Sequence, residues 1–161
     1  MRKAILFLSF TFLTLGLSVQ TRAQDKIDPE TAQQVIQDKI LEEDAAHNLN
    51  VAKQYYKLKK AYKAVLMRFE ETFAAYPQYS KMDEFLYYAG MSSYYLSENK
   101  GKQKLDYDKL SDEEKEKYAP QRLRENAVAY FGMIKENYPS SNFKDDAEKM
   151  LKKLESGSGE Q

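Results

Sequence analysis

The chain of 161 residues balances 25 Lys and Arg against 25 Asp and Glu, so it has no basic footprint for DNA or RNA. It contains no Cys, which excludes disulfides, thiol nucleophiles, cysteine zinc sites and an acylated-cysteine anchor. Hydrophobic residues make up 42% and aromatic residues 13%, enough to build a core, and the length suits one domain.

Residues 1–23 are typical of a removable export signal. Arg2 and Lys3 precede the apolar stretch 4–19, and cleavage is expected after Ala23. As a helix, that stretch would span roughly 24 Å, less than the ~30 Å hydrocarbon core of a bilayer. We therefore predict an exported protein. A retained membrane anchor is the alternative.

Two helices are expected first in residues 24–155, the predicted helical domain. Asp28 would cap the first helix, with Pro29 at its first position and its end near Ala46. The second would cover about 50–76 and stop at Pro77, which lacks a backbone donor. Its apolar residues step by three and four and predict one buried stripe: Tyr62, Val65, Leu66, Phe69, Phe73 and Tyr76.

Ser80 is expected to cap a third helix that runs to about Leu96, with Asp83 as its partner in a capping box. The charged stretch 97–119 follows as an insertion. Within it, Ser111 and Glu114 have the same capping-box spacing, which predicts one or two helical turns.

A fourth helix is predicted over 120–138, ending before Pro139. Asn142 would cap a fifth helix, 143–155. Residues 156–161 are rich in Ser and Gly and predict a disordered tail.

An internal repeat links the ends of the second and fourth helices at an offset of 62 residues. Aromatic side chains seven residues apart lie on one face of a helix, and the proline after them ends that face. The repeated positions are Val65, Phe69, Thr72, Tyr76 and Pro77, matched by Ala127, Phe131, Ile134, Tyr138 and Pro139.

These residues resemble half of the tetratricopeptide (TPR) pattern, A-x₃-F followed by P, at Ala127, Phe131 and Pro139. Leu86 and Gly90 loosely match the other half, and Gly90 would let two paired helices approach closely. A unit of this family takes about 34 residues, so the longer offset places the insertion inside one helical hairpin. The resemblance implies an all-α fold, a short TPR-like solenoid of about five helices.

Tyr-Pro-x-Ser at 138–141 resembles a variant found in periplasmic TPR proteins of the BamD-like outer-membrane assembly type. This resemblance implies a non-catalytic envelope adaptor that binds protein segments through a groove. It also implies a periplasmic location, with association to the outer membrane only indirect, through partners. The same variant occurs in a periplasmic cell-division coordinator, so a role in cell division or envelope coordination is an alternative. A self-associating structural module is another.

No residue set predicts catalysis or a cofactor. Glu43 and His47 lie four apart on a helix but lack the further ligands that zinc requires. Asp106, Asp108 and Asp112 superficially resemble a calcium loop without its turn glycine and terminal glutamate. We expect no metal site and no enzymatic activity.

The 13 tyrosines are the informative excess. Tyrosine offers a large apolar area with a polar tip, which suits binding surfaces. On the third helix, one set of side chains faces away from the paired helix and would line the groove of the resembled family. The alternative is that the first helix or another copy covers it. The candidate protein-binding residues are Glu84, Tyr87, Met91, Tyr94 and Tyr95.

Overall fold

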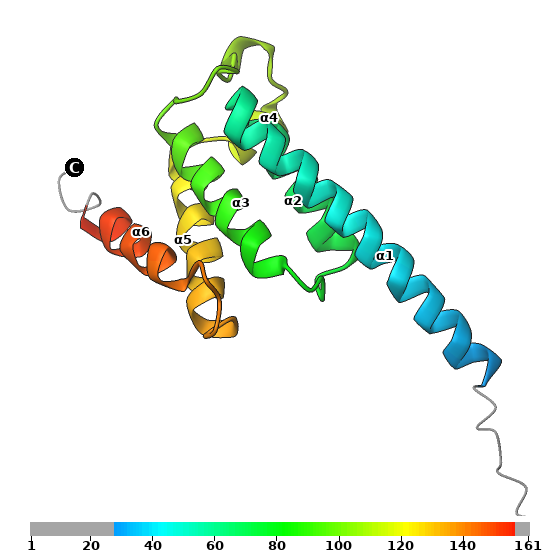
Figure 1. Ribbon diagram of the computed structural model, residues 1–161. Coiled ribbons are helices and arrows are strands. Elements are labelled where there is room, and N and C mark those ends of the chain that lie inside the picture. The colour runs from blue at the N-terminus through cyan, green and yellow to red at the C-terminus, as the bar shows by residue number, and fades with distance from the viewer. Residues whose placement is uncertain (1–27, 157–161) are drawn as a thin grey trace, which may run out of the picture.

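The computed structural model describes residues 28–156, and the predicted signal peptide and residues 157–161 lie outside the described part. All regular elements of the described part are helical, which confirms the all-α prediction (Figure 1). None of these helices is long and apolar enough to cross a membrane. The elements are α1 (Pro29–Gln54), the π-helical turn η1 (Tyr55–Lys59), α2 (Tyr62–Ala75), α3 (Met82–Ser97), the 3₁₀ turn η2 (Tyr107–Lys109), α4 (Asp112–Lys117), α5 (Pro120–Asn137) and α6 (Lys144–Ser156).

The helices form two hairpins and a terminal helix. α1 packs on α2, α2 on α3, α3 on α5, and α5 on α6, so each long helix contacts the next one along the chain. Helix α1 has 26 residues and α2 has 14, and the N-terminal part of α1 projects from the body (Figure 1). The insertion lies between the two helices of the second hairpin, as predicted.

The predicted boundary between the first two helices is wrong. Helix α1 continues through residues 47–49, because Ala45, Leu49 and Ala52 are buried and keep this segment packed on the body. The chain turns instead at Lys60, in the left-handed conformation at φ 48°. No glycine or proline marks this turn, so the sequence carries no local signal for it.

The core contains most of the predicted stripe of α2. Val65 is fully buried and Phe69 is 1% exposed, but Phe73 is 37% exposed and Tyr76 is half-buried. Phe73 was therefore wrongly assigned to the core. Its ring only stacks on that of Phe69, with centroids 5.4 Å apart, at the outer edge of the helix.

The repeat is visible in the backbone of the α2–α3 and α5–α6 corners. Tyr76 N–H donates to Thr72 O at 2.8 Å, and Tyr138 N–H donates to Ile134 O at 3.0 Å. Two further bonds in each corner match at the same offset of 62. In the first corner, Tyr79 N–H donates to Tyr76 O at 3.2 Å and Met82 N–H donates to Tyr79 O at 3.0 Å. In the second corner, Ser141 N–H donates to Tyr138 O at 3.0 Å and Lys144 N–H donates to Ser141 O at 3.2 Å.

The capping predictions had mixed outcomes. Ser111 and Glu114 form the expected capping box of α4. Ser80 does not cap α3, which begins after Lys81, because its N–H and hydroxyl both bond to the carboxylate of Glu42 on α1. At α6, it is Ser141 and not Asn142 whose hydroxyl accepts from a backbone N–H, that of residue 143, at 3.1 Å.

Gly90 has the role predicted for it, the close approach of two paired helices. A Cβ built on this glycine would lie 2.7 Å from Cε1 of Phe131, which is fully buried on α5. Real Cβ atoms almost never come that close to another heavy atom. The missing side chain therefore sets how tightly α3 packs on α5.

Candidate protein-binding surface

The five predicted binding residues all lie on α3, which runs between α1 and α6 (Figure 1). Met91 and Tyr94 were expected to face an open groove. The structure corrects this expectation, because both side chains are buried, each 8% exposed. Tyr87 and Tyr95 are half-buried, and the side chain of Glu84 is 17% exposed. Helix α1 covers part of this face, which is the alternative that the sequence left open.

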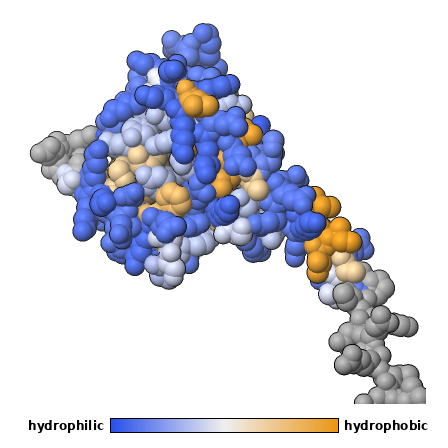
Figure 2. All heavy atoms as spheres, viewed as in Figure 1, coloured by the Kyte–Doolittle hydropathy of each residue, from blue (hydrophilic) through white to orange (hydrophobic). Residues whose placement is uncertain are grey.

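Aromatic rings pave this face of α3 and join it to its neighbours. Tyr88 meets Tyr56 of η1 edge-on at 5.0 Å, and Tyr95 stacks on Tyr62 of α2 at 5.0 Å. Tyr87 stacks on Phe143, just before α6, at 4.9 Å. We call this set the aromatic floor, and Figure 2 shows less hydrophilic residues over α3 between charged ones. Its members are Tyr56, Tyr62, Tyr87, Tyr88, Tyr94, Tyr95 and Phe143.

Four lysines stand over rings of the aromatic floor, and we call them the lysine rim. Lys53 and Lys57 of α1 and η1 lie 6.0 and 5.9 Å from the centroid of the Tyr88 ring. Lys100 and Lys153 lie 5.7 and 4.8 Å from the Tyr94 ring. At such distances a cation is attracted to the negative face of an aromatic ring.

One rim lysine is neutralised within the chain. The ammonium of Lys53 lies 2.5 Å from the carboxylate of Glu84, and this hydrogen bond raises the pKa of Lys53. The hydroxyl of Tyr94 raises the pKa of Lys153. Within residues 28–156, Lys57, Lys100 and Lys153 form no ion pair with a carboxylate. The rim thus presents three cations that could receive carboxylates from outside.

Three tyrosines of the aromatic floor have a raised pKa. Burial away from water raises the pKa of Tyr56 well above its usual range and also raises the pKa of Tyr62 and Tyr87. A protonated phenol can donate as well as accept a hydrogen bond. At Tyr56, Tyr62 and Tyr87 the floor therefore combines apolar area with neutral polar tips under a positive rim.

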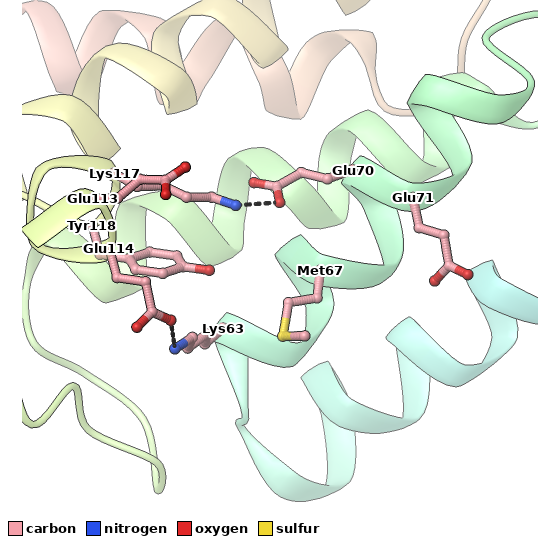
Figure 3. Close-up of a pocket in the computed structure, with 8 residues that line it drawn as sticks. All are labelled: Lys63, Met67, Glu70, Glu71, Glu113, Glu114, Lys117 and Tyr118. Carbon is pink, nitrogen blue, oxygen red and sulfur yellow. Dashed lines mark hydrogen bonds and ion pairs between the residues drawn. The ribbon is translucent and has the colours of Figure 1, made fainter. Parts of the chain in front are cut away.

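A hollow of about 440 Å³ lies between α2 and the insertion, apart from the aromatic floor (Figure 3). Lys63 Nζ lies 2.8 Å from Glu114, and Lys117 Nζ lies 2.6 Å from Glu70, so two ion pairs cross it. Figure 3 shows Glu71 pointing away from the others, and it pairs with Arg68 at 2.6 Å. These contacts use up most of the charge of the hollow.

Tyr118 anchors the insertion beside this hollow. It is 3% exposed, its carbonyl accepts a bond of 2.9 Å from the Tyr107 hydroxyl, and its ring lies 4.9 Å from Lys63 Nζ. The geometry is that of a clamp that holds residues 105–118 against α2, and we assign it no ligand.

The two sets of residues that superficially resembled metal ligands in the sequence do not come together as a site. Glu43 and His47 are both exposed, and Glu43 lies 3.9 Å from Lys39. Asp106 and Asp112 pair with lysines three residues on, at 2.6 and 3.3 Å. Residues 28–156 contain no group of three or more potential metal ligands.

The lysine rim was not predicted from the sequence. Because a break was expected near residue 48, Lys53 and Lys57 were placed on a different helix from the one that covers α3. The only signal was the alternation of Lys and Tyr at 53–63, which does not reveal which ring each cation meets.

Comparison of the chain with protein-family models, curated proteins and solved structures found no match. The candidate surface therefore rests on its own geometry.

Proposed function

We propose that this protein is a non-catalytic adaptor of the cell envelope, which binds acidic protein segments across α3 between α1 and α6. The observation that carries the proposal is the aromatic floor beneath Lys57, Lys100 and Lys153, cations without a carboxylate partner in the described residues. Aromatic anchors surrounded by a polar rim are the usual anatomy of protein recognition sites.

The stacking of the helices supports a TPR-like solenoid as the scaffold for such a site. Two corners repeat the same backbone bonds, and Gly90 fits closely against the ring of Phe131. In this arrangement α1, α3 and α6 are the first helices of successive units, and in the resembled family such helices line the binding face. Placement in the periplasm, near the outer membrane, remains part of the proposal and depends on the predicted signal.

The chemistry of the surface defines the segment that fits it. A carboxylate can approach an ammonium that already lies over a ring without displacing an internal partner, so little is lost on binding. Because Met91 and Tyr94 are buried, the segment lies across the floor and does not insert deeply. We expect modest affinity that falls as ionic strength rises.

The test is photo-cross-linking in the native envelope, with the probe placed at Gln54 beside the lysine rim. Captured proteins should be lost when Lys100 and Lys153 are both changed to Glu, since that reverses the charge over Tyr94. The matched control is Lys135→Glu, an exposed lysine of α5. Capture that is unchanged in the double variant would refute the surface.

The identity of the captured proteins separates the two envelope roles. Outer-membrane assembly components would support the resemblance to BamD-like proteins, whereas cell-division proteins would support the coordinator alternative. Capture of none would leave the adaptor proposal without support and favour the self-associating module.

A further inference from the structure

Helix α1 and the turn after it carry opposite charges at their two ends. Residues 29–44 hold five acidic side chains and one lysine, whereas residues 45–60 hold four lysines and no acid. Charge segregated along one helix favours an antiparallel neighbour with the same pattern, because each acidic end then meets a basic end. The four lysines are Lys53, Lys57, Lys59 and Lys60.

Exposed apolar residues stand at both ends of this polarised segment. Ile36 is 61% exposed, Ile40 53% and Leu58 71%. Ile36, His47 and Leu58 are each eleven residues apart, close to three helical turns, so they share one direction. That direction is opposite to the buried Ala45, Leu49 and Ala52, and Figure 2 shows the apolar group near the projecting end of α1.

A shallow hollow of about 430 Å³ lies on the same face at the basic end. It is lined by Asn50, Lys53, Gln54, Lys57 and Leu58. The hollow offers an apolar contact beside Lys57, since Lys53 already pairs with Glu84. The opposite end of the helix offers apolar side chains beside carboxylates. The two ends of α1 thus complement each other in both shape and charge.

We propose that α1 pairs antiparallel with α1 of a second copy of this chain, about a two-fold axis near His47. Ile36 and Ile40 of each copy then lie in the hollow beside Leu58 of the other. A two-fold interface uses the same patch twice and must be complementary to itself, which this helix is. A parallel pair would place acidic ends together and is disfavoured.

The contact would extend over roughly 33 Å, the rise of the 22 residues from Ile36 to Leu58. One helix pair of this length buries less area than a standard stable interface, which implies a dimer that dissociates on dilution. Added salt should weaken it further by screening the charges at its edges.

Sedimentation velocity of the protein, expressed from the full sequence so that any processing occurs, tests the pairing. We expect a concentration-dependent dimer, shifted to monomer by Ile36→Glu and by Leu58→Glu. The control is Val128→Glu, which places the same charge at a 40% exposed apolar position on α5. Circular dichroism checks that each variant folds. A monomer at all concentrations, or a dimer that forms equally well in the Ile36→Glu and Leu58→Glu variants, would overturn the proposal.

The orientation can be tested cleanly because the chain has no native cysteine. With a short thiol-reactive cross-linker, His47→Cys should cross-link to itself. Ile36→Cys and Leu58→Cys should each remain uncoupled alone and cross-link when mixed. Coupling of Ile36→Cys to itself, with none in the mixture, would mean a parallel pair and would also overturn the proposal. The pairing shares Lys53 and Lys57 with the lysine rim, but neither test changes a rim lysine. A failure here therefore leaves Lys100, Lys153 and the proposed adaptor function intact.

Discussion

The two corners of the molecule share their backbone but not their outer faces. Helices α3 and α6 both follow a helix–proline turn with the same hydrogen bonds. The face of α3 that packs on α5 includes Leu86 and Gly90, whose equivalents in α6 are Glu148 and Lys152. The turn therefore sets how a helix enters the stack, whereas the side chains on its next face decide whether another helix can pack there.

Lys152 shows the physical reason. Gly90 allows the ring of Phe131 to approach its backbone, whereas an exposed lysine at the equivalent position keeps water on that face. Helix α6 packs mainly on α5 among the described helices. Helical stacks commonly end in such a helix, with one apolar and one polar face. Four predictions can sharpen or break this comparison.

The largest expected effect is at the paired phenylalanines. Phe69→Ala and Phe131→Ala should each lower the free energy of unfolding by about 3–5 kcal/mol, because each leaves a cavity in the core. Urea denaturation measures the loss. Phe73→Ala, at a 37% exposed position, serves as the control and should cost about 1 kcal/mol or less. Clearly different losses at Phe69 and Phe131 would contradict the equivalence of the corners, and an equally large loss at Phe73 would contradict its place outside the core.

The two helical glycines should respond in opposite directions. Gly90→Ala forces a Cβ against Phe131, and the overpacking should exceed the gain in helix propensity by about 1 kcal/mol. At Gly132 an added Cβ would have no atom within 4 Å, so Gly132→Ala should stabilise the protein by about 0.5–1 kcal/mol. Thermal unfolding of both variants gives the comparison, and a stabilised Gly90→Ala would show that α3 and α5 have room to spare.

The two serines at the corners should differ less. Ser141 accepts from Phe143 N–H just before α6 and donates to Asp83 at 2.6 Å, so it ties the second corner to α3. Ser141→Ala should cost about 1 kcal/mol, because it removes both bonds. Ser80→Ala should cost about 0.5 kcal/mol or less, because Ser80 is exposed and its side chain bonds only to Glu42. Urea denaturation of the two variants under the same conditions measures both losses. The reverse order would mean that the corner of α3 depends on α1.

The smallest effect concerns acid and the clamp on the insertion. Hydrogen bonding from Lys63 lowers the pKa of Glu114 below its ordinary value of 4.5. The ion pair thus stabilises the docked insertion above pH 4.5, and this contribution is lost as the pH falls through the lowered pKa. Protection from hydrogen exchange at residues 112–118, corrected for the intrinsic pH dependence of amide exchange, should therefore fall in that range. Glu114→Gln should remove this fall. Unchanged protection across this range in the unmodified chain would mean that Tyr118 alone holds the insertion.

The sequence predicted the parts of this fold that local chemistry dictates. The prolines after Tyr76 and Tyr138 end their helices, and Ser111 caps its own short helix, as expected. The turn at Lys60 was missed because no residue there favours the left-handed conformation. The helix that carries the candidate residues was placed correctly, but the burial of Met91 and Tyr94 on it was not foreseen.

By itself, then, the sequence determined the all-helical class, the repeated corners and the need for Gly90 between two helices. These follow from backbone restrictions and from side chains a few residues apart. Only the tertiary structure decided that α1 runs unbroken past its expected end, that lysines from three segments gather over the rings of α3, and that Ser80 bonds to α1 instead of capping its own helix. Those outcomes depend on contacts between residues far apart in the chain, where several partners compete and packing selects one.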